Sequence, residues 1–419
     1  MKNKRFGILL LCLVFGCNST DSQKNTSQKP QNTLKIGLWR ATISLKGGEA
    51  PFQFDLKKTG ENYEVILING KERLKLDEVS VQNDSISITL NIFDAELKAK
   101  ILDNENLEGY WIKYGYKEPY EVPFKAAFGK NYRFEESERK AETDFTGKWE
   151  MTFTDKSQKS YPAVGIFEQK GKKITGTILT PTGDYRYLEG LVEGREIRFS
   201  AFDGSHGFLF IGNLNEQEDF KGEFWAGKLG YETWIGKRNE KAALPDANTL
   251  TYLKDGYQKL EFSFPNLEGK PISLADEKYQ NKVVIVQLFG SWCPNCMDET
   301  AFLAPYFEKN RDRGLEIIGL AYERSPDFEK AKLRIEKMIQ KYKIGYDFLI
   351  AGINDKTEAS KTLPMLNQVL AFPTTIFIDR KGEVRRIHTG FSGPGTGVYY
   401  EKFVIDFQQF MDELLEEKI

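Results

Sequence analysis

The 419-residue sequence contains only two histidines and four cysteines, and these low counts restrict the chemistry that it can carry. A structural zinc site needs four ligands, whereas His206 and His388 stand singly and far apart. A covalent haem site needs a histidine directly after a Cys-x-x-Cys pair, and Met297 occupies that position. We therefore expect no metal and no cofactor.

The sequence also lacks an excess of charge of one sign and, beyond its first residues, any long apolar run. Lys and Arg number 59, Asp and Glu 61. Removal of residues 1–16 would take three basic residues and no acidic one, which leaves a net charge of −5. This balance gives no reason to expect nucleic-acid binding. No stretch after residue 16 is long and apolar enough for a transmembrane helix, and the length suits about three domains.

The N-terminus has the pattern of an export signal. A basic segment, residues 2–5, precedes an apolar core, residues 6–15, that is too short to span a bilayer. Residues 14–17 (Val-Phe-Gly-Cys) resemble a bacterial lipobox, with Phe15 in place of the usual small residue. The resemblance implies cleavage after a signal peptide of residues 1–16 and lipid on Cys17. The alternative is a plain secretory signal with an incidental cysteine.

Residues 17–33 are rich in Ser, Thr, Asn, Gln and Lys and show no apolar periodicity. Such a segment cannot bury a core, and we expect it to act as a flexible tether between the lipid and the folded chain. The expected location is the bacterial cell envelope, with the protein lipid-anchored and facing the periplasm.

Two β domains, residues 34–132 and 145–239, are expected from an internal repeat. Gly37-Leu38-Trp39 recurs as Gly147-Lys148-Trp149, and each copy has short alternating strands separated by Gly, Asn and Asp turns. This pattern is typical of an antiparallel meander, which either leaves one face solvated or curls into a small barrel. Gly-x-Trp at a first strand resembles the calycin group of up-and-down barrels, although about a hundred residues is short for eight strands.

The tryptophans of the β repeats are candidates for binding a small apolar ligand or a protein client. They are Trp39, Trp111, Trp149, Trp225 and Trp234. The alternative is that these aromatic residues fill two small cores. His206 is expected in a turn. The charged segment 133–144 is expected to be a solvated linker between the repeats, and a second boundary is expected near 240–255.

From about residue 257 the pattern changes to alternating strands and helices, which predicts an α/β fold with a mixed sheet. The apolar run at 282–289 predicts a central strand that is covered on both faces. Further strands are expected at 315–321 and 346–350, hairpins at 262–274 and 374–388, and helices at 293–311, 326–341, 358–369 and 400–416.

Cys293 and Cys296 form the candidate redox site. Cys293 is expected at a helix N-terminus, where the helix dipole and unpaired N–H groups stabilise a thiolate. Cys296 follows one turn later on the same face, close enough to close a small disulfide ring. A purely structural bond of this kind would close almost no loop and would stabilise little. The pair therefore predicts redox chemistry.

Wider motifs give this region a family resemblance. Trp292-Cys-Pro-Asn-Cys296 after a buried strand, with Phe372-Pro373-Thr374 about eighty residues later, resembles the thioredoxin fold. The leading hairpin, the extra helix and strand at about 326–350, and Glu299 resemble the TlpA/ResA-like thiol–disulfide oxidoreductases over residues 257–419. The resemblance implies a cis peptide bond at Pro373 beside the disulfide.

The expected mechanism assigns roles to the two cysteines and to one acid. Cys293 would attack a client disulfide, and Cys296 would resolve the mixed disulfide. Thioredoxins place a buried Asp six residues before the first cysteine, but Gln287 stands there and cannot accept a proton. Glu299 is expected to act as the base, the alternative being an ordinary first-turn helix glutamate. The residues expected to shape the client surface are Trp292, Pro294, Asn295, Phe372 and Pro373.

The direction of the reaction is inferred from the same resemblance. No histidine separates the cysteines, in contrast to the strongly oxidising DsbA-type sites, and the family implies a disulfide reductase. Its electron donor would be a membrane thiol carrier of the DsbD or CcdA type. Two alternatives remain: a thiol peroxidase, whose Pro-x-x-x-Thr-x-x-Cys pattern is absent, and a ligand- or client-binding lipoprotein in which the β repeats carry the main function.

Overall fold

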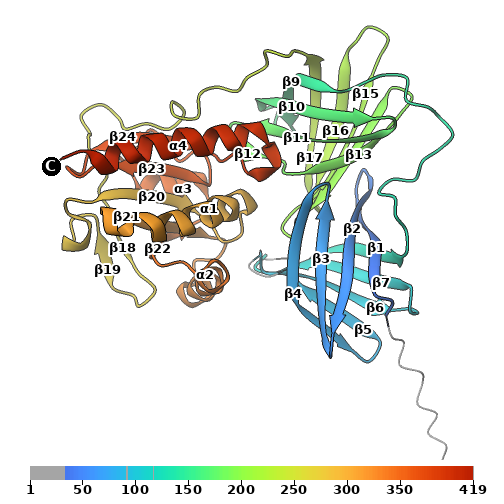
Figure 1. Ribbon diagram of the computed structural model, residues 1–419, viewed down its shortest axis with the longest axis horizontal. Coiled ribbons are helices and arrows are strands. Elements are labelled where there is room, and N and C mark those ends of the chain that lie inside the picture. The colour runs from blue at the N-terminus through green and yellow to red at the C-terminus, as the bar shows by residue number, and fades with distance from the viewer. Residues whose placement is uncertain (1–33, 91–92, 117, 419) are drawn as a thin grey trace, which may run out of the picture. The chain divides into compact units, whose positions relative to one another are not determined.

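The computed structural model describes residues 34–90, 93–116 and 118–418 (Figure 1). The expected signal peptide, the tether and Cys17 lie outside the described residues. Among the residues that are described, no helix has the length and apolar character needed to cross a bilayer.

The first eight strands form a closed antiparallel barrel, in which each strand pairs with the next and β1 pairs with β8. Its strands are β1 (Gly37–Leu45), β2 (Gly48–Thr59), β3 (Asn62–Asn69), β4 (Glu72–Gln82), β5 (Ser85–Thr89), β6 (Ala95–Ile101), β7 (Asn106–Lys113) and β8 (Tyr120–Phe128). The strands alternate between the interior and solvent, since successive side chains point to opposite faces. In β6, Leu97 and Ala99 are buried in the barrel, while Lys98 and Lys100 are not.

The second barrel repeats this architecture. Its eight strands are β9 (Gly147–Asp155), β10 (Ser160–Lys170), β11 (Lys173–Thr180), β13 (Leu188–Glu193), β14 (Glu196–Phe202), β15 (Gly207–Leu214), β16 (Phe220–Ala226) and β17 (Gly230–Arg238). Pairing of β9 with β17 and of β10 with β11 closes the barrel, and the short strand β12 (Gly183–Asp184) pairs with β11.

The expectation that each repeat is short for eight strands was wrong. Tight turns leave most of the residues to the strands: Thr59 pairs with Asn62 across a two-residue turn that contains Gly60 at φ 61°. Two-residue turns with a left-handed residue match the twist of antiparallel strands. A chain of about a hundred residues therefore suffices for a closed eight-stranded barrel.

The five tryptophans of the repeats are core residues. Trp39 and Trp111 are fully buried, and Trp149, Trp225 and Trp234 expose at most 9% of their surface. Trp39, Trp149 and Trp234 pack against phenylalanines of their own barrel. Trp111 meets Phe202 of the second barrel, and Trp225 meets Tyr231. These contacts account for the presence of the five indole rings. They form no exposed aromatic surface for a client.

The connector between the barrels is not solvated along its whole length, which corrects the prediction for residues 133–144. Arg133 is 5% exposed. Its guanidinium donates to Asn69 Oδ1 of the first barrel (2.8 Å) and to Ser200 Oγ of the second (2.9 Å). Residues 135–140 are exposed as expected. One end of the connector thus joins the two barrels, because a buried guanidinium requires partners for its N–H groups.

The C-terminal region contains a five-stranded mixed sheet in the order β22-β21-β20-β23-β24. Its strands are β20 (Val283–Phe289), β21 (Leu315–Glu323), β22 (Asp347–Ile353), β23 (Thr374–Ile378) and β24 (Val384–Thr389), and the leading hairpin is β18 (Ser263–Pro265) with β19 (Pro271–Ser273). The helices are α1 (Pro294–Asn310), α2 (Phe328–Tyr342), α3 (Lys356–Thr362) and α4 (Val398–Glu416). All seven residues of β20 are buried, as predicted for the central strand.

Packing of helices on this sheet forms the core of the region, and one helix is shorter than predicted. Phe407 of α4 contacts Phe377 of β23 with ring centroids 5.8 Å apart. The helix expected at 358–369 ends at Thr362. Pro364 explains the difference, since the residue before a proline is disfavoured in the α conformation. Leu363 accordingly has φ −129° and ψ 67°.

Candidate active site

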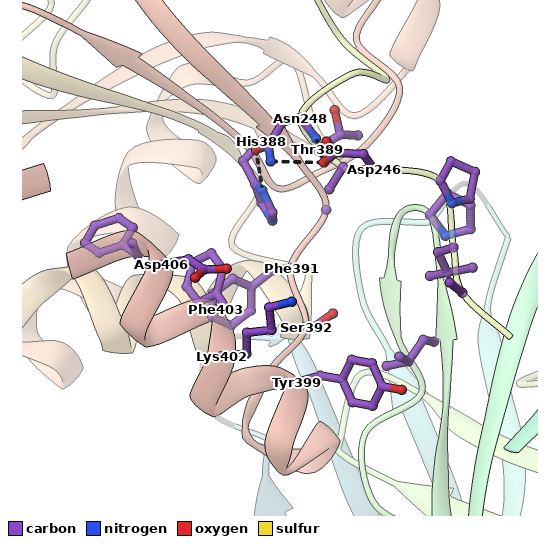
Figure 2. Close-up of a pocket in the computed structure, with 18 of the residues that line it drawn as sticks. Asp246, Asn248, His388, Thr389, Phe391, Ser392, Tyr399, Lys402, Phe403 and Asp406 are labelled. Atoms are coloured by element: carbon purple, nitrogen blue, oxygen red, sulfur yellow. Dashed lines mark hydrogen bonds between the residues drawn. The ribbon is translucent and has the colours of Figure 1, made fainter. Parts of the chain in front are cut away.

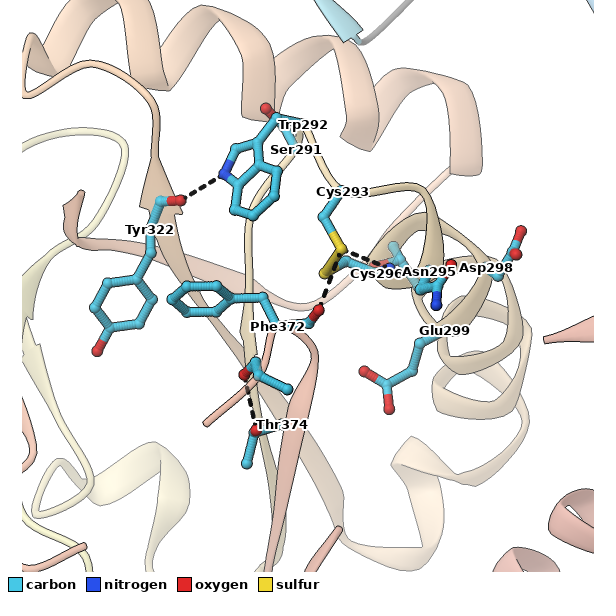
Figure 3. The surroundings of a disulfide bond; sticks show 12 residues. Ser291, Trp292, Cys293, Asn295, Cys296, Asp298, Glu299, Tyr322, Phe372 and Thr374 are labelled. Atoms are coloured by element: carbon cyan, nitrogen blue, oxygen red, sulfur yellow. Dashed lines mark hydrogen bonds between the residues drawn. A yellow bond between two sulfur atoms is a disulfide. The ribbon is translucent and has the colours of Figure 1, made fainter. Parts of the chain in front are cut away.

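The two cysteines of the predicted redox site are joined by a disulfide at the start of α1 (Figure 3). Cys293 is the N-cap residue and Pro294 the first residue of the helix. The Cα atoms of Cys293 and Cys296 lie 5.2 Å apart. The Cys296 backbone N–H donates to Cys293 Sγ at 3.2 Å, so the orphan donors of the helix N-terminus point at this sulfur. That arrangement favours a thiolate at Cys293.

Aromatic residues lie beside the disulfide. Trp292 donates its indole N–H to the Tyr322 carbonyl at 2.8 Å, and its ring meets Phe372 edge-on at 6.0 Å. The Phe372–Pro373 peptide bond is cis, as the resemblance implies, and the Phe372 carbonyl oxygen lies 3.4 Å from Cys293 Sγ. Figure 3 shows Trp292 and Phe372 beside the cysteines, and Pro373 follows Phe372 through the cis bond.

Glu299 is buried one turn beyond Cys296, with 1% of its surface exposed. Its Oε2 accepts a hydrogen bond from Gln287 Nε2 (2.8 Å), and its Oε1 accepts one from Thr375 Oγ1 (2.6 Å). Burial raises the pKa of Glu299 to about 7, while these two hydrogen bonds act in the opposite direction. A carboxyl group that titrates near neutrality suits proton transfer at physiological pH.

Sequence reasoning missed two other contacts that hold the site. Thr375 lies on β23, two residues after the cis proline Pro373, and nothing in its spacing identified it as a partner of Glu299. Glu323, at the end of β21, accepts hydrogen bonds from the Ser291 backbone N–H (2.8 Å) and from Ser291 Oγ (2.9 Å). Burial raises the pKa of Glu323. These bonds fix the turn that leads from β20 into Cys293.

Comparisons with known proteins agree with this geometry. Residues 256–387 match the model of the AhpC/TSA family. The chain is 25% identical over 162 residues to the thiol-disulfide oxidoreductase ResA of Geobacillus thermodenitrificans, a match that covers 39% of this chain and 79% of that protein. It is 28% identical over 138 residues to the thioredoxin-like protein YneN of Bacillus subtilis, covering 33% of this chain and 73% of that protein. The C-terminal region is thioredoxin-like. It carries the Cys-x-x-Cys motif of a thiol–disulfide oxidoreductase.

Among solved structures, a thiol-disulfide oxidoreductase from Bacteroides fragilis is similar to 35% of this chain. The match spans 99% of that chain at 21% sequence identity, with a TM-score of 0.26.

Residues of the second barrel contact the thioredoxin-like domain at three positions around the cysteines, none of which was expected from the sequence. Ser205 Oγ donates to the Trp292 carbonyl (3.0 Å), Asn295 Nδ2 donates to the Asp184 carbonyl (3.4 Å), and Arg186 forms an ion pair with Asp298. Burial raises the pKa of Asp298 to about 6, and Arg186 acts in the opposite direction.

His206 occupies a turn, as predicted, but takes no part in the redox site. Its backbone N–H and that of Ser205 donate to Asp203 Oδ1, and its Nδ1 lies 3.2 Å from Asp203 Oδ2. The turn between β14 and β15 is thereby closed around one carboxylate.

A pocket of about 620 Å³ lies between β10 and β11 of the second barrel, residues 242–248 and α4 (Figure 2). His388 Nδ1 is hydrogen bonded to Asn248 Oδ1 at its edge (3.0 Å). Side chains of both charges, Lys402 and Asp406 among them, line the pocket. Among the described residues, none of the predicted site residues lines this pocket. The redox chemistry therefore belongs to the surroundings of Cys293 and Cys296.

Proposed function

We propose that the protein is a protein-disulfide reductase of the bacterial cell envelope that acts through a Cys293/Cys296 dithiol–disulfide couple. The observation that carries the proposal is the disulfide at the N-terminus of α1 with the buried Glu299 one turn further along. The resemblance to proteins named as thiol–disulfide oxidoreductases supports the same chemistry.

The reaction begins with the reduced protein. The Cys293 thiolate attacks one sulfur of a client disulfide, a bond forms between Cys293 and the client, and the other client sulfur leaves as a thiolate. Cys296 then attacks Cys293 Sγ, which closes the 293–296 disulfide and releases the second client sulfur. The client gains two electrons and two protons, and the dithiol loses them.

Glu299 serves the second step as a general base. Cys296 is fully buried, and burial disfavours a thiolate, so its proton must pass to a nearby acceptor. Glu299 lies three residues further along α1, on the same helix face. Its pKa near neutrality lets it accept that proton and then release it.

The reductive direction and the electron donor follow from the family resemblance. Pro294 and Asn295 place no positive charge between the cysteines that would stabilise the reduced form strongly. The electron donor is then a membrane thiol carrier of the DsbD or CcdA type, which transfers two electrons to the 293–296 disulfide.

Attachment to the membrane is part of the proposal. The basic and apolar residues 2–15 and the lipobox-like residues 14–17 support export and lipid attachment at Cys17. The polar segment 17–33 would then keep the folded chain near the periplasmic face of a membrane, within reach of a membrane carrier.

The test is the reduction potential of the Cys293–Cys296 pair, measured by equilibrating the chain from residue 18 with glutathione or dithiothreitol buffers. A value near or below that of thioredoxin, about −270 mV, is the expected result. A value near that of DsbA, about −120 mV, would reverse the proposed direction. Absence of any reversible two-electron couple would refute the redox function.

A further inference from the structure

The reactive disulfide is covered. Cys293 exposes 6% of its surface and Cys296 none, whereas thiol–disulfide exchange requires an attacking sulfur to reach one of the two. We propose that two turns of the second barrel, residues 182–187 and 203–206, form a lid over the disulfide that must move aside before a protein partner can react. This inference rests on the proposed function, because only a reacting disulfide gives a lid its effect.

The first contact of the lid lies directly before Cys293. Ser205 is fully buried, and its hydroxyl donates to the Trp292 carbonyl (3.0 Å). Lys113 of the first barrel supports this turn from behind, because its Nζ donates to the Ser205 carbonyl (2.9 Å). Both barrels therefore contribute to this contact.

The second contact lies between the two cysteines. Asn295 Nδ2 donates to the Asp184 carbonyl, and a Cβ atom placed on Gly183 would lie 1.9 Å from that nitrogen. Gly183 has φ 147°, a backbone conformation that favours glycine, so the lid meets Asn295 at a position without a side chain. The Asp184 carboxylate accepts from the Gly393 backbone N–H (2.8 Å), a second link to the thioredoxin-like domain.

The third contact lies one turn beyond, where Arg186 is held between two carboxylates. It pairs with Glu72 of the first barrel and with Asp298 of α1, and the three side chains expose 11%, 6% and 21% of their surface. Arg186 has a left-handed φ of 57°, and its backbone N–H donates to Asp184 Oδ1 (2.6 Å). A non-glycine residue in this conformation needs surrounding bonds to hold it.

All three contacts are polar, which allows the lid to separate from the thioredoxin-like domain. Interfaces between domains that rest on hydrogen bonds and ion pairs separate more readily than apolar cores, since the groups released are hydrated again. The Arg186–Asp298 pair is the charged link between lid and helix, and both side chains are largely buried. Loss of this pair shifts the protein toward an open form.

The experiment measures how fast the oxidised chain from residue 18 is reduced by two reagents, dithiothreitol and reduced thioredoxin. Arg186→Met and Asp298→Ala each break the pair, and Asp298→Ala leaves the Arg186–Glu72 pair inside the barrels intact. A tenfold larger open fraction raises the rate with thioredoxin about tenfold. The rate with dithiothreitol, a small molecule, rises much less. The ratio of the two rates cancels any change in the reactivity of the cysteines themselves.

Arg198→Met is the matched control, because Arg198 pairs with Glu193 and Glu196 in the same barrel and touches no cysteine neighbour. Its ratio of rates should equal that of the wild type. An unchanged ratio in Asp298→Ala, or the same increase in Arg198→Met, would overturn the lid. If neither reagent reduces any of the chains, the proposed function fails, and the lid fails with it.

Discussion

Gln287 and Glu299 are hydrogen bonded in the interior of the thioredoxin-like domain, with Gln287 Nε2 donating to Glu299 Oε2 at 2.8 Å. Gln287 lies on the central strand β20 and Glu299 on α1, so the strand supplies a donor to a buried acid on the helix. Because Thr375 donates to the other carboxylate oxygen, both oxygens of the buried carboxyl group are satisfied from neighbouring elements.

The substitution Glu299→Gln should slow the resolving step without preventing the first attack. In the wild type the rate of the Cys296 attack should rise with pH through about 7, since Glu299 accepts a proton only when it is ionised. Loss of a general base costs about 10²-fold or more. Stopped-flow measurement of 293–296 disulfide formation between pH 5 and 9 should show a rate that rises near pH 7 in the wild type. The Glu299→Gln variant should show no such rise.

Glu308→Gln provides the control for this prediction. Glu308 lies on the same helix, is exposed and pairs with Arg311. Its substitution should leave the pH profile unchanged. If the rate of disulfide formation in Glu299→Gln still rises near pH 7, another group is responsible for the pH dependence.

Serine variants of the two cysteines should differ in how much mixed disulfide with a client they accumulate. Cys296→Ser retains the attacking thiolate at the helix N-terminus and should trap clients as mixed disulfides, because no second sulfur can resolve them. Cys293→Ser should trap none, as Cys296 is fully buried. Non-reducing gel electrophoresis with a disulfide-bearing test protein measures the difference. Equal trapping by both variants would contradict the assigned order of attack.

The sequence alone predicted those features that depend on a local pattern of residues. The run at 283–289 is uniformly apolar and forms the central strand, and Cys293 with Pro294 begins α1. Contacts between distant segments were not accessible in this way. Ser205 and Arg186 approach the cysteines only because two closed barrels bring their turns there, and Ser-His or Asp-Tyr-Arg in a turn carries no signal of a partner a hundred residues away.

The burial of single charged residues was also not predicted from the sequence. Arg133 stands at the start of a highly charged segment, and its composition indicated solvent exposure, yet its guanidinium joins the two barrels. Composition describes an average over the segment, whereas burial of a single guanidinium depends on whether Asn69, Ser200 and Glu189 meet it in space.

The substitution Arg133→Met should destabilise the barrels. It removes the hydrogen bonds of the guanidinium to Asn69 Oδ1 and Ser200 Oγ and its ion pair with Glu189, whose side chain is 28% exposed. Because hydrogen bonds to a charged group contribute about 1.5–3 kcal/mol, we expect a loss of about that size. Urea unfolding followed by circular dichroism measures the loss. Arg139→Met, at an exposed position of the same segment, should change the free energy of unfolding by no more than about 0.5 kcal/mol. Equal stability of the two variants would show that Arg133 does not tie the barrels together.

The substitution Trp149→Ala should separate the stability of the second barrel from the redox chemistry. Trp149 is 1% exposed, packs against Phe220 with ring centroids 4.7 Å apart, and donates its indole N–H to the Phe145 carbonyl (2.8 Å). Removing a buried tryptophan side chain costs about 3–5 kcal/mol, through lost apolar burial and the cavity left behind. Leu229→Ala, at a site that is 66% exposed, serves as the control and should have little effect.

Below the unfolding transition, Trp149→Ala should leave the reduction potential of Cys293–Cys296 unchanged, because the potential depends on the groups that surround the sulfurs. A shifted potential would mean that the barrel core influences the disulfide directly.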